Sequence, residues 1–225
     1  MNDRCCRHEF KFYINHMDMA QLRSGLSHMA RLDEHAGENN SYRVRSLYFD
    51  NFDDKALMEK LSGLDEREKF RIRMYNNDLS FIRLEKKSRK KGKYYKDNAV
   101  ISAKECMELI NGKRAVLKTN GSSLTYELYN KMITQLLRPK NIVEYIREAY
   151  TFPMGNVRIT LDHDMRTITN IKAFLESEPK SIPITGIIIL EVKYDDFMPD
   201  IVSRMITLQG RQASSFSKYS ASRII

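Results

Sequence analysis

The sequence has few cysteines, glycines and prolines and lacks a long apolar run. Its 225 residues include three cysteines, nine glycines and five prolines. Cys5 and Cys6 are adjacent and no CxxC spacing occurs, so we predict neither a disulfide framework nor a zinc site. The longest aliphatic run, residues 187–190, is far shorter than the roughly 18 to 20 apolar residues of a membrane span. We see no secretion signal and expect one domain over residues 1–225 in a reducing cytoplasm.

Two common nucleotide-binding loops are also missing. Neither GxxxxGK[ST] nor GxGxxG occurs, which excludes the usual loop-based phosphate cradles. Positive charge, in contrast, is abundant: 38 Lys and Arg against 29 Asp and Glu give a net charge of +9. This excess predicts an anionic partner, and nucleic acid, acidic lipid and phosphorylated small molecules all qualify.

Most of the cations fall in segments where apolar and charged residues alternate. Arg71 and Arg73, for example, alternate with Phe70, Ile72 and Met74. A period of two places such residues on opposite faces of a strand. The pattern predicts about eight strands, at residues 7–12, 42–49, 70–75, 81–87, 93–101, 142–150, 157–162 and 187–194. Helical spacing and capping residues predict helices at 18–31, from 102 onward, at 123–138 and at 199–208.

Two architectures accommodate amphipathic strands mixed with helices. An open antiparallel sheet would expose its charged face to water. A closed barrel would instead enclose that face and cover its apolar outside with helices. The charged face repeats Arg and Lys with single, spaced Glu residues, a composition unlike a solvated surface. This composition favours the closed barrel, and we predict an α+β fold in which the charged strand faces enclose a channel.

Three strands carry the triplet Glu-x-Lys, at residues 9–11, 85–87 and 191–193. Residues i and i+2 share a face, so each triplet aims a carboxylate and an ammonium in the same direction. Together with the arginines, these triplets predict a cationic lining with a few carboxylates, suited to a polyanion that brings a divalent metal. On the residues alone, Glu191 is as compatible with a salt bridge as with a metal ligand, Glu9 with an orienting partner of Lys11, and Tyr145 with a core position.

Nucleic acid fits this pattern less well. The cations sit in strands, without an exposed aromatic platform or the pattern of a recognition helix.

At these same residues the sequence resembles the VTC domain, the polyphosphate polymerase branch of the triphosphate tunnel metalloenzymes within the CYTH-like superfamily. The similar stretches follow one another over nearly the whole chain. They are residues 7–12, 46–51, 70–75, 84–87, 145–147, 157–162, 189–194 and 217–219. The sequence shows neither the phosphate-sensing helical domain nor the membrane helices of the eukaryotic complexes, so the resemblance is to a stand-alone bacterial type.

The resemblance implies a closed eight-stranded antiparallel β-barrel, a tunnel, with helices packed on its outside. It also implies an ATP-dependent polyphosphate polymerase that uses Mn²⁺ or Mg²⁺. It implies ATP and polyphosphate as partners and leaves room for membrane-associated partner proteins. The implied catalytic residues are Lys11, Arg71, Arg73, Lys87, Arg147, Arg158 and Glu191. The implied phosphate- or nucleotide-binding residues are Lys96, Tyr145, Lys193, Ser217 and Lys218, with Lys93 competing with Lys96, and the implied metal ligands are Glu191 and Glu9. The same scaffold allows a triphosphatase, if water is the nucleophile, or a non-catalytic polyphosphate- or nucleotide-binding module.

Overall fold

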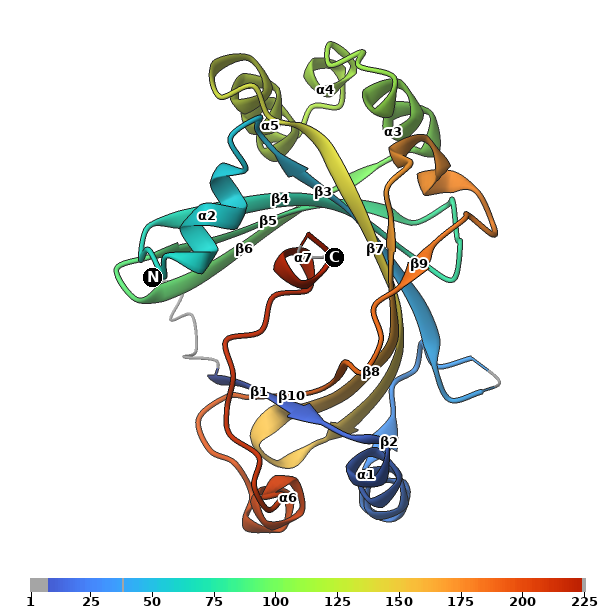
Figure 1. Ribbon diagram of the computed structural model, residues 1–225, viewed down its shortest axis with the longest axis vertical. Coiled ribbons are helices and arrows are strands. Elements are labelled where there is room, and N and C mark those ends of the chain that lie inside the picture. The colour runs from blue at the N-terminus through green and yellow to red at the C-terminus, as the bar shows by residue number, and fades with distance from the viewer. Residues whose placement is uncertain (1–7, 38, 224–225) are drawn as a thin grey trace. The chain divides into compact units, whose positions relative to one another are not determined.

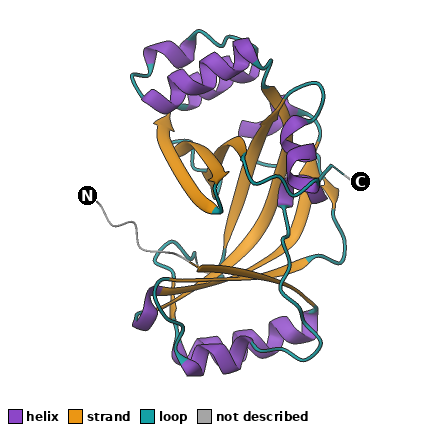
Figure 2. Cartoon of the chain, turned by 90° about the vertical axis from the view of Figure 1, so that its left-hand side faces the viewer, coloured by secondary structure: helices purple, strands orange, loops and turns teal. Residues whose placement is uncertain are grey.

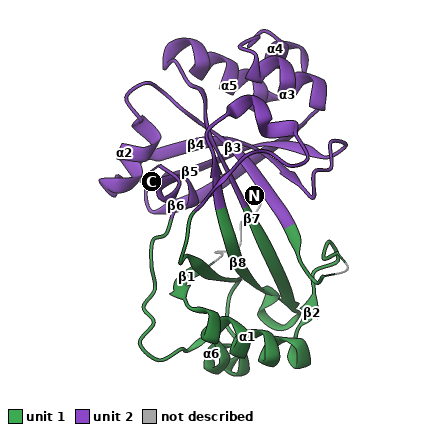
Figure 3. Cartoon of the chain, turned by 45° about the vertical axis from the view of Figure 1, so that its right-hand side comes forward, with its two compact units in different colours: residues 1–42, 145–165, 184–216 green, residues 43–144, 166–183, 217–225 purple. Residues whose placement is uncertain are grey.

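A computed structural model describes residues 8–37 and 39–223 of the chain. These residues form two compact units, each assembled from three segments (Figure 3). Unit 1 comprises residues 1–42, 145–165 and 184–216, and unit 2 comprises residues 43–144, 166–183 and 217–225. Cys5, Cys6 and Arg7 lie outside the described residues, so the sequence predictions on them are not addressed by the structure. That residues 1–225 act as one domain stays a prediction.

Unit 1 is a sheet covered on one face by helices. Its strands follow the order β1-β10-β8-β7, with β2 paired to β7, and β7 and β8 continue into unit 2 (Figure 3). The helices contribute Leu22, Leu26 and Val202 to an apolar core with Leu161 and Leu190 of the sheet. The elements are β1 (His8–Ile14), α1 (His16–Met29), β2 (Arg31–Leu32), β7 (Arg138–Phe152), η1 (Met154–Asn156), β8 (Val157–Ile168), β10 (Ile188–Tyr194) and α6 (Asp200–Ile206).

Unit 2 continues the strand order as β7-β3-β4-β5-β6, with β9 paired to β8. Helices α3, α4 and α5 lie on one side of β4, β5 and β6, and α7 lies on the other (Figure 1). The core on the first side joins Phe70, Ile72 and Leu84 to Leu117 and Leu128. The elements are β3 (Tyr42–Asp50), α2 (Lys55–Leu61), β4 (Arg67–Tyr75), β5 (Ile82–Lys90), β6 (Lys93–Ile101), α3 (Ala103–Ile110), α4 (Val116–Thr119), α5 (Ser123–Thr134), η2 (Ile171–Leu175), β9 (Ile182–Pro183) and α7 (Lys218–Ala221).

The predicted α+β class with an antiparallel sheet is confirmed. The pairs β1–β10, β10–β8, β3–β4, β4–β5 and β5–β6 are all antiparallel, and helices lie against the strands (Figure 2). The predicted closed barrel is confirmed only in part, because the antiparallel sheet is curled into a half-barrel. Over the described residues the hydrogen-bonded order runs as an open path from β1 to β6. The end strand β6 carries Lys93, Lys96 and Asp97, and such charges discourage further pairing at a sheet edge.

Element boundaries differ from the predictions where local capping decides them. Helix α1 begins at His16 because Asn15 and Asp18 form a capping box. Helix α5 ends at Thr134 instead of residue 138, since Leu136 has a φ of 55° and Arg138 already belongs to β7. The predicted capping box at Ser102 is confirmed, with its hydroxyl accepting from the Glu105 amide at 3.1 Å. Helices α2, α4 and α7 were not predicted from the sequence.

Cys106 of α3 is buried in the core of unit 2. Within residues 8–37 and 39–223, no helix combines the length and the apolar character that crossing a bilayer requires.

Candidate functional site

The charged face of unit 1 holds a ring of two carboxylates and two ammonium groups. The register of β1 and β10 places Lys11 opposite Glu191 and Glu9 opposite Lys193. Each lysine contacts both acids: Lys11 pairs with Glu9 and lies 3.8 Å from Glu191, while Lys193 pairs with Glu191 and lies 3.7 Å from Glu9. The side chain of Glu191 is 8% exposed. Two of the three predicted Glu-x-Lys triplets therefore meet in one cluster of balanced charge.

Two arginines of the predicted lining lie on neighbouring strands of unit 1, each bound to a carboxylate. Arg147 donates from Nε and Nη2 to Asp162 at 2.6 and 2.8 Å, and its Cζ lies 5.4 Å from the ring centroid of Tyr145. Burial opposes the Arg147 charge, but Asp162 outweighs it and raises the pKa of Arg147. Arg158 donates to the Tyr42 hydroxyl at 2.8 Å and pairs with Asp33 at 2.9 Å.

Tyr145 is buried in unit 1, as expected for a core residue, yet it also borders the Arg147 guanidinium. A cation over an aromatic face is attracted by the ring quadrupole. The burial and the ligand-binding interpretations of Tyr145 are thus compatible.

Glu9 and Glu191 offer a donor set that suits a small divalent ion. Mg²⁺ and Mn²⁺ prefer oxygen ligands, and Mg²⁺ is bound through one or two carboxylates plus waters and substrate phosphates. Among the described residues, no cluster of three or more His, Cys, Asp or Glu side chains is arranged to hold a metal. Two carboxylates match the protein ligands that Mg²⁺ takes when substrate phosphates and waters supply the others. Lys11 and Lys193 supply the counter-charge in the present arrangement.

Unit 2 carries a second cluster, built around one deeply buried carboxylate. Glu85 is 1% exposed and accepts from Arg71 Nε and Nη2 at 2.7 and 2.5 Å. Lys96 lies 2.7 Å from Glu85, and Arg73 lies 4.0 Å away. Burial on its own would raise the pKa of Glu85, but the positive charges of Arg71, Arg73 and Lys96 dominate and lower it strongly. Glu85 is thus a fixed anion among cations.

Tyr48 and Ser46 of β3 complete this cluster and are absent from the predicted site residues. Arg71 Nη1 donates to the Tyr48 hydroxyl at 3.3 Å, and Arg73 Nε donates to Ser46 Oγ at 3.1 Å. Burial opposes ionisation of Tyr48, yet the charges of Arg71, Lys69 and Arg73 outweigh it and lower the pKa of this phenol to about 8. The alternation within β3 was a usable signal, because it places both side chains on the face opposite Leu47.

We expect Tyr48 to ionise well before a normal tyrosine. The phenolate absorbance of the native protein should rise with a step near pH 8 that Tyr48→Phe removes. Because the usual tyrosine pKa is about 10, ionisation of Tyr48 contributes stability that is complete above pH 10 and is lost as the pH falls through 8. Tyr150 is the control, since burial raises its pKa to about 12 and Tyr150→Phe should leave the step in place. A native titration without that step would contradict the predicted environment.

The remaining predicted residues also belong to unit 2. In the register of β5 and β6, Lys87 pairs with Lys96, so these two share a face, whereas Lys93 pairs with Lys90 on the other face. The register thus favours Lys96 over Lys93. Ser217 caps α7, and Lys218 is the first residue of that helix.

Tyr219 of α7 links this helix to β3. Its ring stacks on Tyr48 with centroids 5.0 Å apart, and its hydroxyl donates to Asp50 at 2.8 Å. Asp50 in turn accepts from the Ala56 and Leu57 amides of α2. The segment with Ser217 and Lys218 is therefore anchored beside the Arg71 cluster through a buried stack.

The antiparallel fold is that of the triphosphate tunnel metalloenzyme class. A candidate adenylyl cyclase from Hippeastrum, described as having a dominant triphosphatase activity, has a similar structure with a TM-score of 0.59, 15% identity, and coverage of 97% of this chain and 96% of its own. A protein from Bacillus halodurans, also named as a candidate adenylate cyclase, has a similar structure with a TM-score of 0.51 and 14% identity. The match covers 88% of this chain and 83% of the Bacillus chain. At such identities the likeness concerns the fold. No curated protein matches the chain.

The chain belongs to the VTC domain family, whose model matches residues 6–224. The tunnel class to which this family belongs binds nucleoside triphosphates or polyphosphate and generally uses divalent metal ions.

Proposed function

We propose that the protein is an ATP-dependent polyphosphate polymerase, which transfers the terminal phosphoryl group of ATP to a growing polyphosphate chain. The observation that carries this proposal is the charged face of β4, β5 and β6. Over these fully described strands it bears one carboxylate, Glu85, and eight cations. They are Arg67, Lys69, Arg71, Arg73, Arg83, Lys87, Arg89 and Lys96. A surface of this composition attracts a polyanion with many charges more strongly than a singly charged one.

The proposed roles follow from phosphoryl-transfer chemistry, which requires positioning and charge neutralisation more than covalent catalysis. Arg71 and Arg73 would hold phosphate oxygens, because the guanidinium offers several donors in a fixed plane. Lys87, Lys96 and Lys218 would add compact charges for successive phosphates, with Ser217 as a hydroxyl donor. In unit 1, Lys11, Lys193, Arg147 and Arg158 would neutralise charge, with Tyr145 packing beneath Arg147.

Glu191, assisted by Glu9, would hold the divalent ion, Mn²⁺ or Mg²⁺. When bound, such an ion neutralises charge on the phosphate oxygens and favours departure of the leaving group. The lysines then act on the phosphates instead of on the carboxylates. This exchange of partners is consistent with the moderate distances of 3.7 and 3.8 Å in two of the four contacts of the ring.

A triphosphatase is the second candidate, and the activity stated for the Hippeastrum protein favours it. The two functions differ in the nucleophile, which is water in one case and the end of a polyphosphate chain in the other. A non-catalytic binding module is the third candidate. It is less well supported because the acidic pair of a metal site, Glu9 and Glu191, is present.

One incubation separates the three candidates. The purified protein receives ATP with Mn²⁺ or Mg²⁺, and the products are run on a gel stained for polyphosphate while free phosphate is assayed in parallel. We expect polyphosphate and ADP. Free phosphate without a polymer would instead identify a triphosphatase. If neither product exceeds the level of the Glu191→Gln variant, the enzyme proposal fails and the binding module replaces it.

A further inference from the structure

The cations on the charged face of β4, β5 and β6 stand directly opposite one another. The register pairs Arg67 with Arg89, Lys69 with Lys87, Lys87 with Lys96, and Arg73 with Arg83. Like charges in directly opposed cross-strand positions destabilise a sheet. These repeated like-charge pairs therefore lower the stability of the sheet in the protein alone. An anion between the opposed side chains would remove that repulsion.

Arg67 and Arg89 occupy one end of this row. Arg67 precedes Arg71 by four residues, a separation along the strand of about 14 Å. A triphosphate contains two P–O–P links, and its length falls short of that separation. A phosphate group bound at Arg71 therefore leaves Arg67 and Arg89 to a longer anion.

Local contacts hold both side chains at the strand ends. Arg67 donates to the Leu64 carbonyl. Arg89 Nε lies 3.2 Å from Asp65, and its Cζ lies 5.4 Å from the ring centroid of Tyr94. The Asp65 side chain is 46% exposed, and an ion pair so open to solvent is weak and easily displaced by a polyanion.

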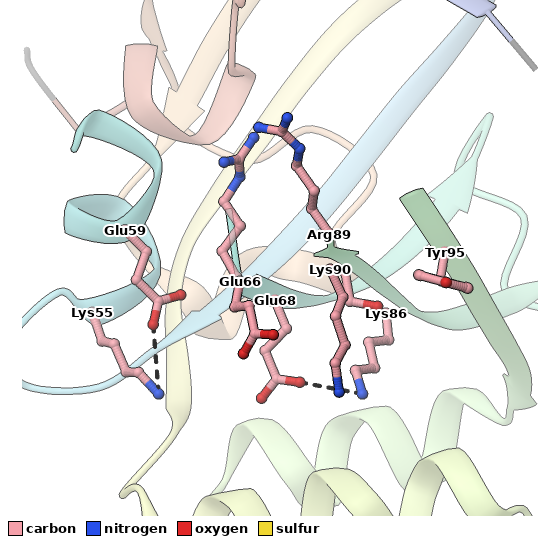
Figure 4. A pocket seen from close by; sticks show the side chains of 10 residues that line it. Lys55, Glu59, Glu66, Glu68, Lys86, Arg89, Lys90 and Tyr95 are labelled. Atoms are coloured by element: carbon pink, nitrogen blue, oxygen red, sulfur yellow. Dashed lines mark ion pairs between the residues drawn. The ribbon is translucent and has the colours of Figure 1, made fainter. Parts of the chain in front are cut away.

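A cavity of about 360 Å³ borders the same strand ends and carries side chains of both charge signs. Glu59, Glu66 and Glu68 line it, together with Arg67, Arg89, Lys86 and Lys90. Figure 4 shows the Arg89 side chain leaving the sheet on the side opposite to Glu66, Glu68, Lys86 and Lys90. The three carboxylates make the cavity less suited to a polyanion than the charged face that carries Arg71, to which Arg67 and Arg89 also belong.

We infer that Arg67 and Arg89 form a distal subsite for linear polyphosphate, which binds the part of the chain beyond the three phosphates held at Arg71 and Arg73. The inference rests on the proposed function in taking polyphosphate as the ligand. It adds a preference for chain length: the subsite favours a polymer over a triphosphate. Binding can be measured without turnover, so the two proposals can fail separately.

The test compares two ligands, tripolyphosphate and size-fractionated long-chain polyphosphate, by calorimetry at fixed ionic strength. The double variant Arg67→Gln/Arg89→Gln is expected to bind the long chain about tenfold more weakly or worse, the scale of losing charge-assisted hydrogen bonds. Its affinity for tripolyphosphate should change by less than about twofold, because charges farther apart than the Debye length of about 8 to 10 Å are largely screened.

Lys90→Gln/Lys93→Gln is the matched control. It removes the same charge from the same end of the sheet, but from the opposite face. We expect it to retain the preference for the long chain, and Arg67→Lys/Arg89→Lys, which keeps both charges, to retain most of it. Melting curves establish that all variants are folded.

Three outcomes would overturn the subsite: an unchanged affinity for the long chain, equal losses for both ligands, or an equal loss in the Lys90/Lys93 control. If the native protein binds neither ligand, the subsite and the proposed function fall together. If it prefers the long chain in the expected way but makes no product, the polymerase proposal falls and the subsite stands.

Discussion

Replacing Glu191 by Gln is expected to lower turnover by at least about a hundredfold, on the scale of losing one strong electrostatic group at a reacting centre. Gln keeps the shape of the side chain but removes the charge that would fix a divalent ion. The cations of unit 2 that we propose to bind phosphate are untouched, so binding of polyphosphate should persist. The measurement is the steady-state rate with ATP and Mn²⁺, alongside calorimetric binding of polyphosphate.

Two further variants show whether the effect is specific. Glu34→Gln removes a carboxylate that is 87% exposed and should leave both quantities unchanged. Arg73→Ala should weaken binding and turnover together, because its guanidinium would contact phosphate in the ground state as well as in the transition state. A Glu191→Gln protein with nearly native turnover would remove this residue from the metal site.

Replacing Glu85 by Gln should cause the largest loss of stability on the charged face of unit 2. The change leaves Arg71, which is 7% exposed, without its carboxylate and places it near Arg73 and Lys96. Breaking a buried ion pair from one side costs about 3 kcal/mol or more. For a chain of this size that corresponds to a melting temperature about 6 to 12 °C lower. Differential scanning calorimetry at neutral pH measures the change.

The effects of tripolyphosphate and of pH on the difference in melting temperature distinguish an electrostatic cause from a packing defect. Tripolyphosphate should narrow the gap between the variant and the native protein, because the bound anion replaces the missing charge. The gap should also shrink in acid. The pKa of Glu85 is lowered in the folded protein, so its stabilising contribution is present above the ordinary carboxyl pKa of about 4 and is lost as the pH falls through the lowered value. Equal melting temperatures at neutral pH would refute the expectation.

The strands of the charged sheet were predictable because each buries one face and charges the other. The strand expected near residues 93–101 is β6, and alternation found the last six residues of β4, whose first three residues, Arg67 to Lys69, lack a fully buried side chain. The short helices α2 and α7 escaped detection for a different reason. Their position depends on Asp50 and Tyr219, which meet through a hydrogen bond between residues far apart in sequence.

The candidate site also has a part that the sequence predicts and a part that it does not. Spacing within one strand predicts that Lys11 and Glu9, or Arg71 and Arg73, share a face. The partners of these side chains depend on the register between strands, which periodicity leaves open. The contacts of Arg71 with Glu85 and Tyr48, and of Arg147 with Asp162, are of this second kind. Tyr48 was overlooked, although alternation within β3 places it on the charged face, because its neighbours Leu47 and Phe49 are apolar.

The bond between Tyr219 and Asp50 joins residues 169 positions apart, and this separation matters during synthesis. Contacts of long sequence separation form late and slow the folding of a chain. Strands β3 to β6 leave the ribosome well before α7, so the anchor of Ser217 and Lys218 is the last part of unit 2 to arrive. A nascent chain therefore lacks the ring that stacks on Tyr48 until synthesis reaches α7, so the surroundings of the Arg71 cluster are completed last.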